Sequence, residues 1–260
     1  MIRKRLVGVI TVKQGWAVQS IGYKQHLPMG RPEVVAENLD RWGVDEILLQ
    51  CIDRQGQGPD LALLQRLTRR GLSTPLTYQG GIRSVADGVA AVQAGAERIA
   101  MDSLLRDDPR EAAALAEPLG AQALIGVLPL ARVQGQLQWL DARSRRATPV
   151  PAEVAAVLKS GAISELLVVD WQGEGRPEAF DEGLLDAWRD QAHMPQLPLI
   201  AFGGLSSAAQ LRRVLARPEV VAAGIGNFLA WREHAVQDLK AQLRDLPLRG
   251  PRYAVEQAWS

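Results

Sequence analysis

The chain has 260 residues, of which 47% are hydrophobic and 23% are charged, and its formal net charge is +1. A charge this close to zero excludes the strongly basic surface of a nucleic-acid-binding protein or of one held on an acidic membrane. The single cysteine, Cys51, excludes a disulfide framework. The sequence shows no signal-peptide pattern and no apolar run near the ~20 residues of a membrane span, so we expect a cytoplasmic protein.

Eight short apolar runs alternate with longer amphipathic stretches. We predict strands at residues 5–12, 46–52, 75–79, 97–102, 123–130, 165–170, 198–202 and 219–225. Helical patterns lie between them, among others at residues 31–42, 84–94, 151–160 and 206–216. Apolar strands separated by helices are typical of parallel strands that are covered on both faces. The pattern predicts an α/β fold, either a closed (β/α)8 TIM barrel or an open doubly wound sheet.

The two halves of the chain resemble each other. Residues 75–84 read PLTYQGGIRS and residues 198–207 read PLIAFGGLSS, which match without a gap at an offset of 123 residues. Eight units and an internal repeat favour the closed form. We therefore predict a single (β/α)8 TIM barrel with a two-fold half-barrel repeat over residues 1–248, followed by a C-terminal tail at residues 249–260.

Paired glycines follow the predicted third and seventh strands, at Gly80-Gly81 and Gly203-Gly204. Ligands of such barrels bind at the carboxyl ends of the strands, and glycine lets backbone N–H groups approach an anion. We predict two phosphate sites, completed by Ser103 and by Gly226-Asn227. The alternative is that the glycines only make tight turns. Asp102 beside Ser103 would repel a phosphate, so the second site is the cleaner of the two.

Four strands begin with a charged residue, and these residues are Arg5, Glu46, Arg98 and Glu165. Strand starts meet at the bottom of a barrel, where two positive and two negative charges can neutralise one another. By residue chemistry alone, a structural salt-bridge plug or four solvated charges is the simpler interpretation, and a gate across a central channel is the alternative.

Other polar residues give weaker signals. Asp53 and Asp170 lie near the ends of the second and sixth strands, where an aspartate can serve catalysis or form a turn. Lys24 and His26 lie in a long loop after the first strand, which we expect to fold over a ligand. For Trp171 we expect a space-filling role at the rim, with stacking on a ligand as the alternative. No histidine pair or Cys/His cluster has metal-ligand spacing, so we predict neither a metal nor a cofactor.

Taken in order, several segments resemble one family. Residues 3–15, 43–49, 80–84, 95–98, 203–204 and 228–240 follow the pattern of the cyclase subunit of imidazole glycerol phosphate synthase, and the resemblance covers about residues 1–245. It implies a glutaminase subunit docked at the barrel bottom, with Glu97 at the contact, and a phosphorylated substrate at the top. It also implies that the four charges at the strand starts are an ammonia gate, with Arg98 in place of a lysine.

The family's two catalytic aspartates are replaced here. The aspartate that ends the first strand falls on Thr11, and the one that ends the fifth strand falls on Pro129. Neither residue can act as a carboxylate acid or base near neutral pH. A substrate-loop lysine falls on Gln19, and the aspartate after the second strand falls on Cys51. The candidate catalytic positions that remain are Thr11, Asp53 and Asp170.

The resemblance and the replacements together imply an ammonia-using, lyase-type subunit of a glutamine amidotransferase complex. We expect it to aminate or amidate a phosphorylated or nucleotide-linked sugar in bacterial surface-polysaccharide biosynthesis. Two alternatives stay open. One is true cyclisation in histidine biosynthesis by altered residues, and the other is a non-catalytic scaffold that activates a glutaminase.

Overall fold

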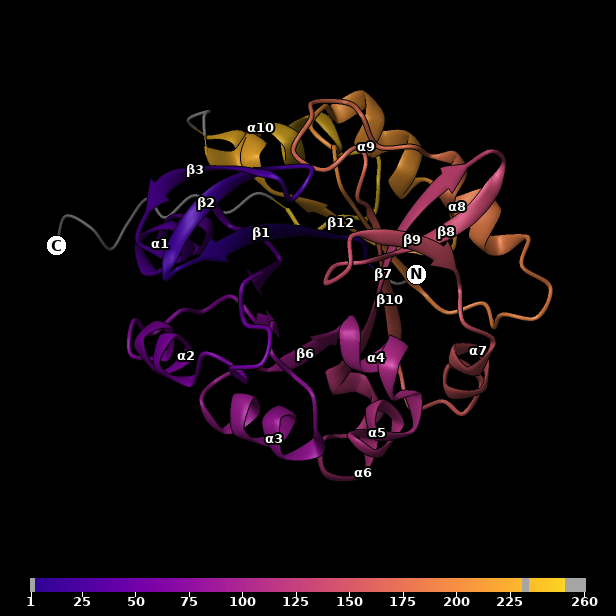
Figure 1. Cartoon of the computed structure of the whole chain (residues 1–260). Helices are drawn as coiled ribbons and strands as arrows, with labels where there is room; N and C mark the ends of the chain where they lie inside the picture. The colour runs from indigo at the N-terminus through magenta and orange to yellow at the C-terminus, as the bar shows by residue number, and fades with distance from the viewer. Residues whose placement is uncertain (1–2, 231–233, 251–260) are drawn as a thin grey trace, which may run out of the picture.

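Eight parallel strands close into a barrel in the computed structural model, which describes residues 3–230 and 234–250 (Figure 1). The strands are β1 (Arg5–Lys13), β4 (Glu46–Cys51), β5 (Leu76–Gln79), β6 (Arg98–Met101), β7 (Leu124–Val133), β10 (Glu165–Asp170), β11 (Leu199–Phe202) and β12 (Val220–Ile225). They pair in this order, and β12 pairs with β1 to complete the circle. The predicted (β/α)8 TIM barrel is confirmed, and the open doubly wound sheet is wrong.

The predicted elements lie where the hydrophobic pattern put them, with ends that differ by three residues at most. The four predicted helices are α1 (Pro32–Trp42), α3 (Val85–Gln93), α7 (Ala152–Lys159) and α9 (Ala208–Leu215). Ser84 and Ser207 cap α3 and α9, because each hydroxyl accepts a hydrogen bond from a backbone N–H three residues on. The further helices are α2 (Leu61–Thr68), α4 (Ser103–Asp107), α5 (Pro109–Ala114), α6 (Ala116–Leu119), α8 (Gly183–Arg189) and α10 (Ala235–Gln242), with 3-10 turns η1 (Ala121–Ala123) and η2 (Asn227–Ala230).

Two antiparallel extensions of the barrel were not predicted. The segment after β1, expected to be a loop, forms β2 (Trp16–Ile21) and β3 (Gln25–Gly30). The segment after β7 forms β8 (Gln136–Asp141) and β9 (Arg146–Pro149) in the same way. The first turn of each extension has matching φ angles, 51° and 78° at Gln14-Gly15 and at Gln134-Gly135. The half-barrel repeat thus extends beyond the glycine loops.

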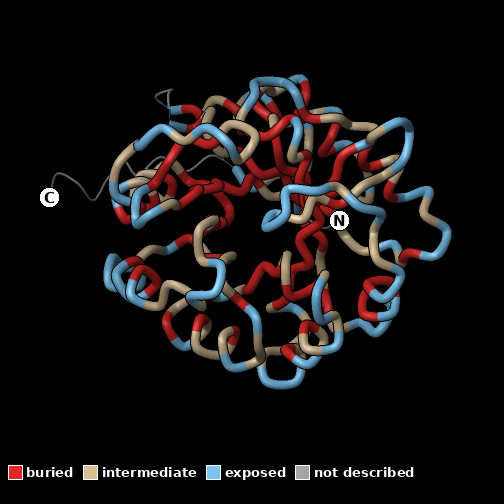
Figure 2. The backbone as a smooth tube through the Cα atoms, viewed as in Figure 1, coloured by how far each residue is buried: buried red, intermediate tan, exposed pale blue. Residues whose placement is uncertain are grey.

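The barrel has an outer and an inner apolar core. Along β1, Leu6 and Ile10 pack outward with the helices, while Val7 and Val9 point inward. Figure 2 shows that the buried parts of the chain follow the barrel strands. The inner cluster consists of Val7, Val9, Leu48, Ala100, Ile125, Val127, Leu167, Val169, Ile200, Phe202 and Ala222. The lumen is therefore lined with apolar side chains, mostly aliphatic.

The end of the described chain is fixed to the barrel by a buried ion pair. Lys240 on α10 lies 2.8 Å from Asp45 Oδ1, and the other oxygen of Asp45 accepts a hydrogen bond from Leu6 N at 2.8 Å. Residues 251–260 of the predicted tail lie outside the described residues, so the tail stays a prediction. Among the helices of the described ranges, none is long and apolar enough to cross a membrane.

Candidate functional site at the two ends of the barrel

The four charges that open barrel strands form a closed ring across the bottom of the barrel. Arg5 lies 3.3 Å from Glu46 and 2.7 Å from Glu165, measured between nitrogen and oxygen. Arg98 contacts the same two glutamates at 3.7 and 2.8 Å. Each arginine therefore lies between two glutamates, and the signs alternate around the ring.

The ring is mostly shielded from water, with side-chain exposures from 5% for Glu46 to 21% for Arg5. Thr77 donates a further hydrogen bond to Glu46. Burial opposes the ionisation of Glu165, but the attraction of Arg5 and Arg98 outweighs burial and lowers the pKa of Glu165. Glu165 is therefore ionised at neutral pH, as the ring requires.

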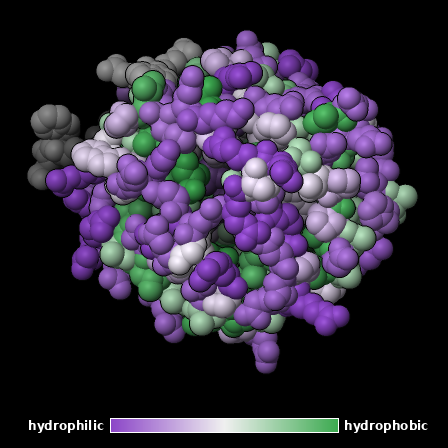
Figure 3. Space-filling model, viewed as in Figure 1, coloured by the Kyte–Doolittle hydropathy of each residue, from purple (hydrophilic) through white to green (hydrophobic). Residues whose placement is uncertain are grey.

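A cavity of about 620 Å³ opens at the opposite end, where the strands finish. Its lining includes Ala100, Val127 and Val169, which also belong to the inner cluster. The walls come from the loops after β4, β5 and β6 and from the turns of both antiparallel extensions. In Figure 3, hydrophilic side chains cover much of the central part of this face. We name this the mouth cavity; it and the charged ring lie at the two ends of the inner cluster.

The mouth cavity carries an excess of positive charge. Arg143 is paired with Asp107 at 2.5 Å, whereas Lys24 and Arg83 have no ion-pair partner within the described part of the chain. A concave site with excess positive charge favours an anionic ligand. The cationic side chains that line it are Lys13, Lys24, Arg54, Arg83, Arg143 and Arg145, against three carboxylates, Asp102, Asp107 and Asp108.

Two residues of the cavity wall hold buried nitrogen atoms without a hydrogen-bond partner among the described residues. These atoms are His26 Nε2 and Trp171 Nε1. The other ring nitrogen of His26 lies 3.1 Å from Lys13 Nζ. Burial, followed by the charges of Lys13 and Arg145, lowers the pKa of His26, so its ring is neutral at pH 7. Because buried polar atoms are nearly always paired, these two positions indicate a site for a ligand or for bound water.

The two glycine pairs, Gly80-Gly81 and Gly203-Gly204, allow the same close backbone contact in the two halves of the barrel. A Cβ atom on Gly80 would lie 2.5 Å from the carbonyl oxygen of Cys51, and one on Gly203 would lie 2.4 Å from that of Asp170. Both glycines have a positive φ, of 142° and 111°. Each pair therefore lets a loop pack against the end of the preceding strand. The turn-making role accounts for the glycines whether or not an anion also binds.

The mouth cavity lies at the predicted phosphate site after β5, although the sequence favoured the site after β11. Gly80, Gly81 and Ser103 line it, and the residues of the other site, Gly203, Gly204, Gly226 and Asn227, do not. At that other site Asn227 is engaged by β2. Its Nδ2 donates to Ser20 O at 2.7 Å, and its Oδ1 accepts from Ser20 N at 3.3 Å.

The three candidate catalytic residues do not line the mouth cavity. Thr11 is buried on the inner side of β1, above Val9. Asp53 Oδ2 accepts a hydrogen bond from the backbone N–H of Gln14 at 2.6 Å. Asp170 is buried and accepts three backbone hydrogen bonds from residues 172–181. Both carboxylates are therefore engaged by backbone N–H groups. Asp170 stabilises the turn that follows it, the alternative that the sequence left open, and Asp53 contacts the turn after β1.

Asp102 is a carboxylate of the mouth cavity whose importance the sequence did not reveal. Burial is the largest effect on it and raises its pKa to about 7, against the smaller opposing effects of Trp139 and Arg106. Trp139 Nε1 donates a hydrogen bond to Asp102 Oδ1 at 3.3 Å. Pro129, at the position of a family aspartate, lines the same cavity. The missing signal was the contact with Trp139, which lies 37 residues further along the chain.

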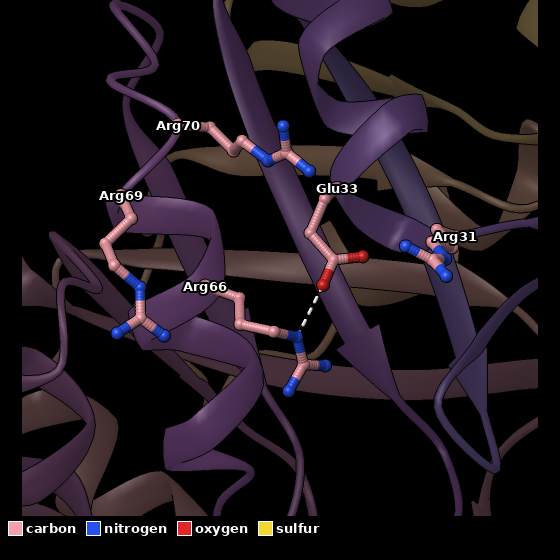
Figure 4. A pocket seen from close by; sticks show the side chains of 5 residues that line it. All are labelled: Arg31, Glu33, Arg66, Arg69 and Arg70. Carbon is pink, nitrogen blue, oxygen red and sulfur yellow. Dashed lines mark hydrogen bonds and ion pairs between the residues drawn. The ribbon is translucent and has the colours of Figure 1, made fainter.

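A second cavity, of about 360 Å³, lies on the outside of the barrel at α1 and α2 (Figure 4). Glu33 accepts a hydrogen bond from Arg66 at 2.5 Å, and Arg66 is 44% exposed. Glu33 itself is buried, so the pair is only partly solvated, and none of the residues that line this cavity belongs to the inner cluster. Its lining residues are Arg31, Glu33, Arg66, Arg69 and Arg70. Within the described ranges, no group of three or more His, Cys, Asp or Glu residues could hold a metal ion.

The chain matches known proteins over most of its length. Residues 5–234 match the family described as "Histidine biosynthesis protein". The chain is 26% identical over 253 residues to the imidazole glycerol phosphate synthase subunit HisF of Exiguobacterium sp., with 96% of this chain and 97% of that protein covered. It is 26% identical to the HisF subunit of Lacticaseibacillus paracasei, with coverages of 94% and 97%. It is 28% identical to that of Hyphomonas neptunium, with coverages of 88% and 89%. The chain therefore belongs to the histidine biosynthesis protein family.

Proposed function

We propose that the chain is the ammonia-using subunit of a synthase of the imidazole glycerol phosphate synthase type. Ammonia enters at the charged ring and reacts at the mouth cavity with a phosphorylated acceptor. The observation that carries the proposal is the placement of a closed ring of four charges and a cation-lined cavity at opposite ends of one barrel.

The lumen between these two ends suits neutral ammonia. Its lining is apolar, and charged ammonium would lose hydration without a partner there. Ammonia must be produced next to the ring, which requires a glutaminase partner on the bottom face. Glu97, exposed beside Arg98, is the residue that we assign to this contact.

The acceptor is anionic. Lys24 and Arg83 supply unpaired positive charge, and Gly80, Gly81 and Ser103 supply the predicted phosphate loop on the same cavity. The three relatives are all subunits of imidazole glycerol phosphate synthase and are covered over most of their length. They favour the substrate of that enzyme, and hence the cyclisation reaction that the sequence left as an alternative.

A second acceptor class rests on one observation. The positions of the family's catalytic aspartates hold Thr11 and Pro129, so the cyclisation chemistry requires another acid–base group. Amination of a phosphorylated or nucleotide-linked sugar in surface-polysaccharide synthesis would explain the replacements by a change of substrate. None of the three relatives is named for such a reaction, so we place this candidate second.

The test is an assay without any partner. The purified chain is mixed with the substrate of imidazole glycerol phosphate synthase and an ammonium salt at pH 8, and product is followed by mass spectrometry. We expect ammonium-dependent formation of imidazole glycerol phosphate, together with growth of a histidine auxotroph that lacks its own cyclase subunit. If the substrate binds but is not turned over, the proposed cyclisation is wrong. Nucleotide-linked sugars would then be the next acceptors to assay. Activation of a glutaminase without any aminated product would identify a scaffold instead.

A further inference from the structure

Asp102 differs from the other carboxylates of the mouth cavity because no ion pair neutralises it within the described residues. Asp107 is paired with Arg106 and Arg143. Asp108 caps α5 through a hydrogen bond from Glu111 N at 3.0 Å. Trp139 donates a hydrogen bond to Asp102 Oδ1. Among the residues that the structure describes, none donates a hydrogen bond to the second oxygen, Oδ2.

The Asp102 side chain does not cap the helix that follows it. Asp102 occupies the position before α4, where an aspartate normally caps the helix, but it accepts no capping hydrogen bond. Its side chain lines the mouth cavity and is partly exposed there. Oδ1 is held by an indole that is itself fully buried. The carboxylate is thus fixed at one oxygen and open to a ligand at the other.

Titratable groups lie near this carboxylate on three elements. Arg106 and Asp107 face it from α4, Asp141 faces it from the end of β8, and Tyr23 lies near it at the turn between β2 and β3. Burial raises its pKa most, Trp139 and then Arg106 lower it, and Asp107 and Asp141 raise it further, with a result of about 7. A group with this pKa can both take up and release a proton at physiological pH.

We propose, on the basis of the function proposed above, that Asp102 is the acid–base group for the reaction of ammonia at the mouth cavity. It takes the place of the two carboxylates that are lost at Thr11 and Pro129. Its open oxygen Oδ2 faces the acceptor, and Trp139 positions the carboxyl group through Oδ1.

For a carbonyl acceptor, the step requires two proton transfers from nitrogen to oxygen, both through Asp102. Ammonia forms a bond to the carbonyl carbon, so its nitrogen becomes positive and the carbonyl oxygen becomes negative. Asp102 removes a proton from the nitrogen and delivers it to the oxygen. A second transfer of the same kind breaks the carbon–oxygen bond. Ammonia and the carbonyl compound thereby yield an imine and one water molecule, and the carboxylate is regenerated without any oxidant or reductant.

The experiment compares Asp102→Asn with the wild-type chain in the ammonium-driven assay. The matched control is Asp60→Asn, which makes the same chemical change at the cap of α2, outside the cavity, where asparagine caps equally well. We expect kcat to fall about 10²–10⁴-fold in Asp102→Asn, with substrate affinity by calorimetry not reduced, and Asp60→Asn to behave as wild type. Asp102→Glu should recover part of kcat.

The pH profile supplies the second readout. The kcat of the wild type should follow an ionisation near pH 7, and this ionisation should be absent from Asp102→Asn. Asp102→Ser serves if the asparagine variant does not fold, as judged by circular dichroism. If the wild type is active and Asp102→Asn is fully active too, or differs from it in KM alone, Asp102 is not the acid–base group. The proposed function would then still stand. A wild type that binds the substrate but shows no ammonium-driven turnover would overturn both.

Discussion

Trp139 donates its indole hydrogen to Asp102 Oδ1 over 3.3 Å, and this bond joins β8 to the loop that follows β6. The indole is fully buried, so its orientation is fixed by packing. The extension after β7 therefore does more than cover the barrel, because it sets the position and the pKa of a carboxyl group in the mouth cavity.

Trp139→Phe should raise the pKa of Asp102 by roughly one unit, because the lost hydrogen bond stabilises the ionised form more than the neutral form. Phenylalanine keeps most of the buried volume, so the fold should survive. The measurement is a carboxyl-carbon NMR titration, with the resonance assigned by its absence in Asp102→Asn. An unchanged or lower pKa in Trp139→Phe would show that the indole does not govern this group.

Asp102→Asn should become more stable relative to wild type as the pH rises. The pKa of Asp102 is about 7 in the folded chain, above its ordinary value of 3.8. Between these two values the folded state holds a proton that the unfolded state has lost. The free energy of unfolding of the wild type therefore falls as the pH rises from about 4 to about 7. Urea unfolding at pH 5 and pH 8 should show the difference between variant and wild type growing by on the order of 2 kcal/mol. A constant difference would mean that Asp102 titrates normally.

Arg83→Gln should weaken the binding of a phosphorylated ligand about tenfold, since it removes an unpaired cation of the mouth cavity and a lost charged contact costs about 1–2 kcal/mol. Calorimetry with pyrophosphate at low salt is the direct measurement. The control, Arg213→Gln, removes an arginine that is paired with Glu182 on the outside of the barrel. Equal losses in both variants would indicate unspecific attraction rather than a site.

Asn227→Ala should loosen the β2–β3 extension, because it removes two hydrogen bonds to the backbone of Ser20. We expect faster amide exchange at residues 19–23 and a stability loss of about 1–2 kcal/mol, with pyrophosphate affinity unchanged. Weaker binding of pyrophosphate with unchanged amide exchange would instead support the phosphate-binding role that the sequence predicted for Asn227.

The barrel strands could be predicted because a parallel strand buried on both faces leaves a continuous apolar run, such as 165–170, whose bounds match β10. The antiparallel extensions were missed because their first turns use Gln14-Gly15 and Gln134-Gly135. Both residues of each turn have positive φ, for which Asn-Gly or Asp-Gly is the usual signal. Spacing along the chain revealed neither extension.

The charged ring could be predicted from strand starts alone, since Arg5, Glu46, Arg98 and Glu165 each open a strand and parallel strands start at one end. The properties of Asp102 could not be predicted in this way. Its pKa depends on burial below the β8 extension and on Trp139, which the sequence did not place near it. Asp53 and Asp170 gave a stronger sequence signal but are engaged by backbone N–H groups.

The most direct test of the account measures coupling across the barrel in Arg5→Ala, in complex with the glutaminase partner. The readout is product formed per glutamate released from glutamine, beside product formed from added ammonium. Thermal unfolding must be recorded as well, because removing one member of a shielded ring costs up to about 3–5 kcal/mol; Arg5→Lys is the milder variant. Arg132→Ala, at the opposite end and paired with Asp181, is the control. We predict that Arg5→Ala keeps its ammonium-driven rate but forms far less product per glutamate. An unchanged ratio in a folded Arg5→Ala complex would contradict a path for ammonia through the ring.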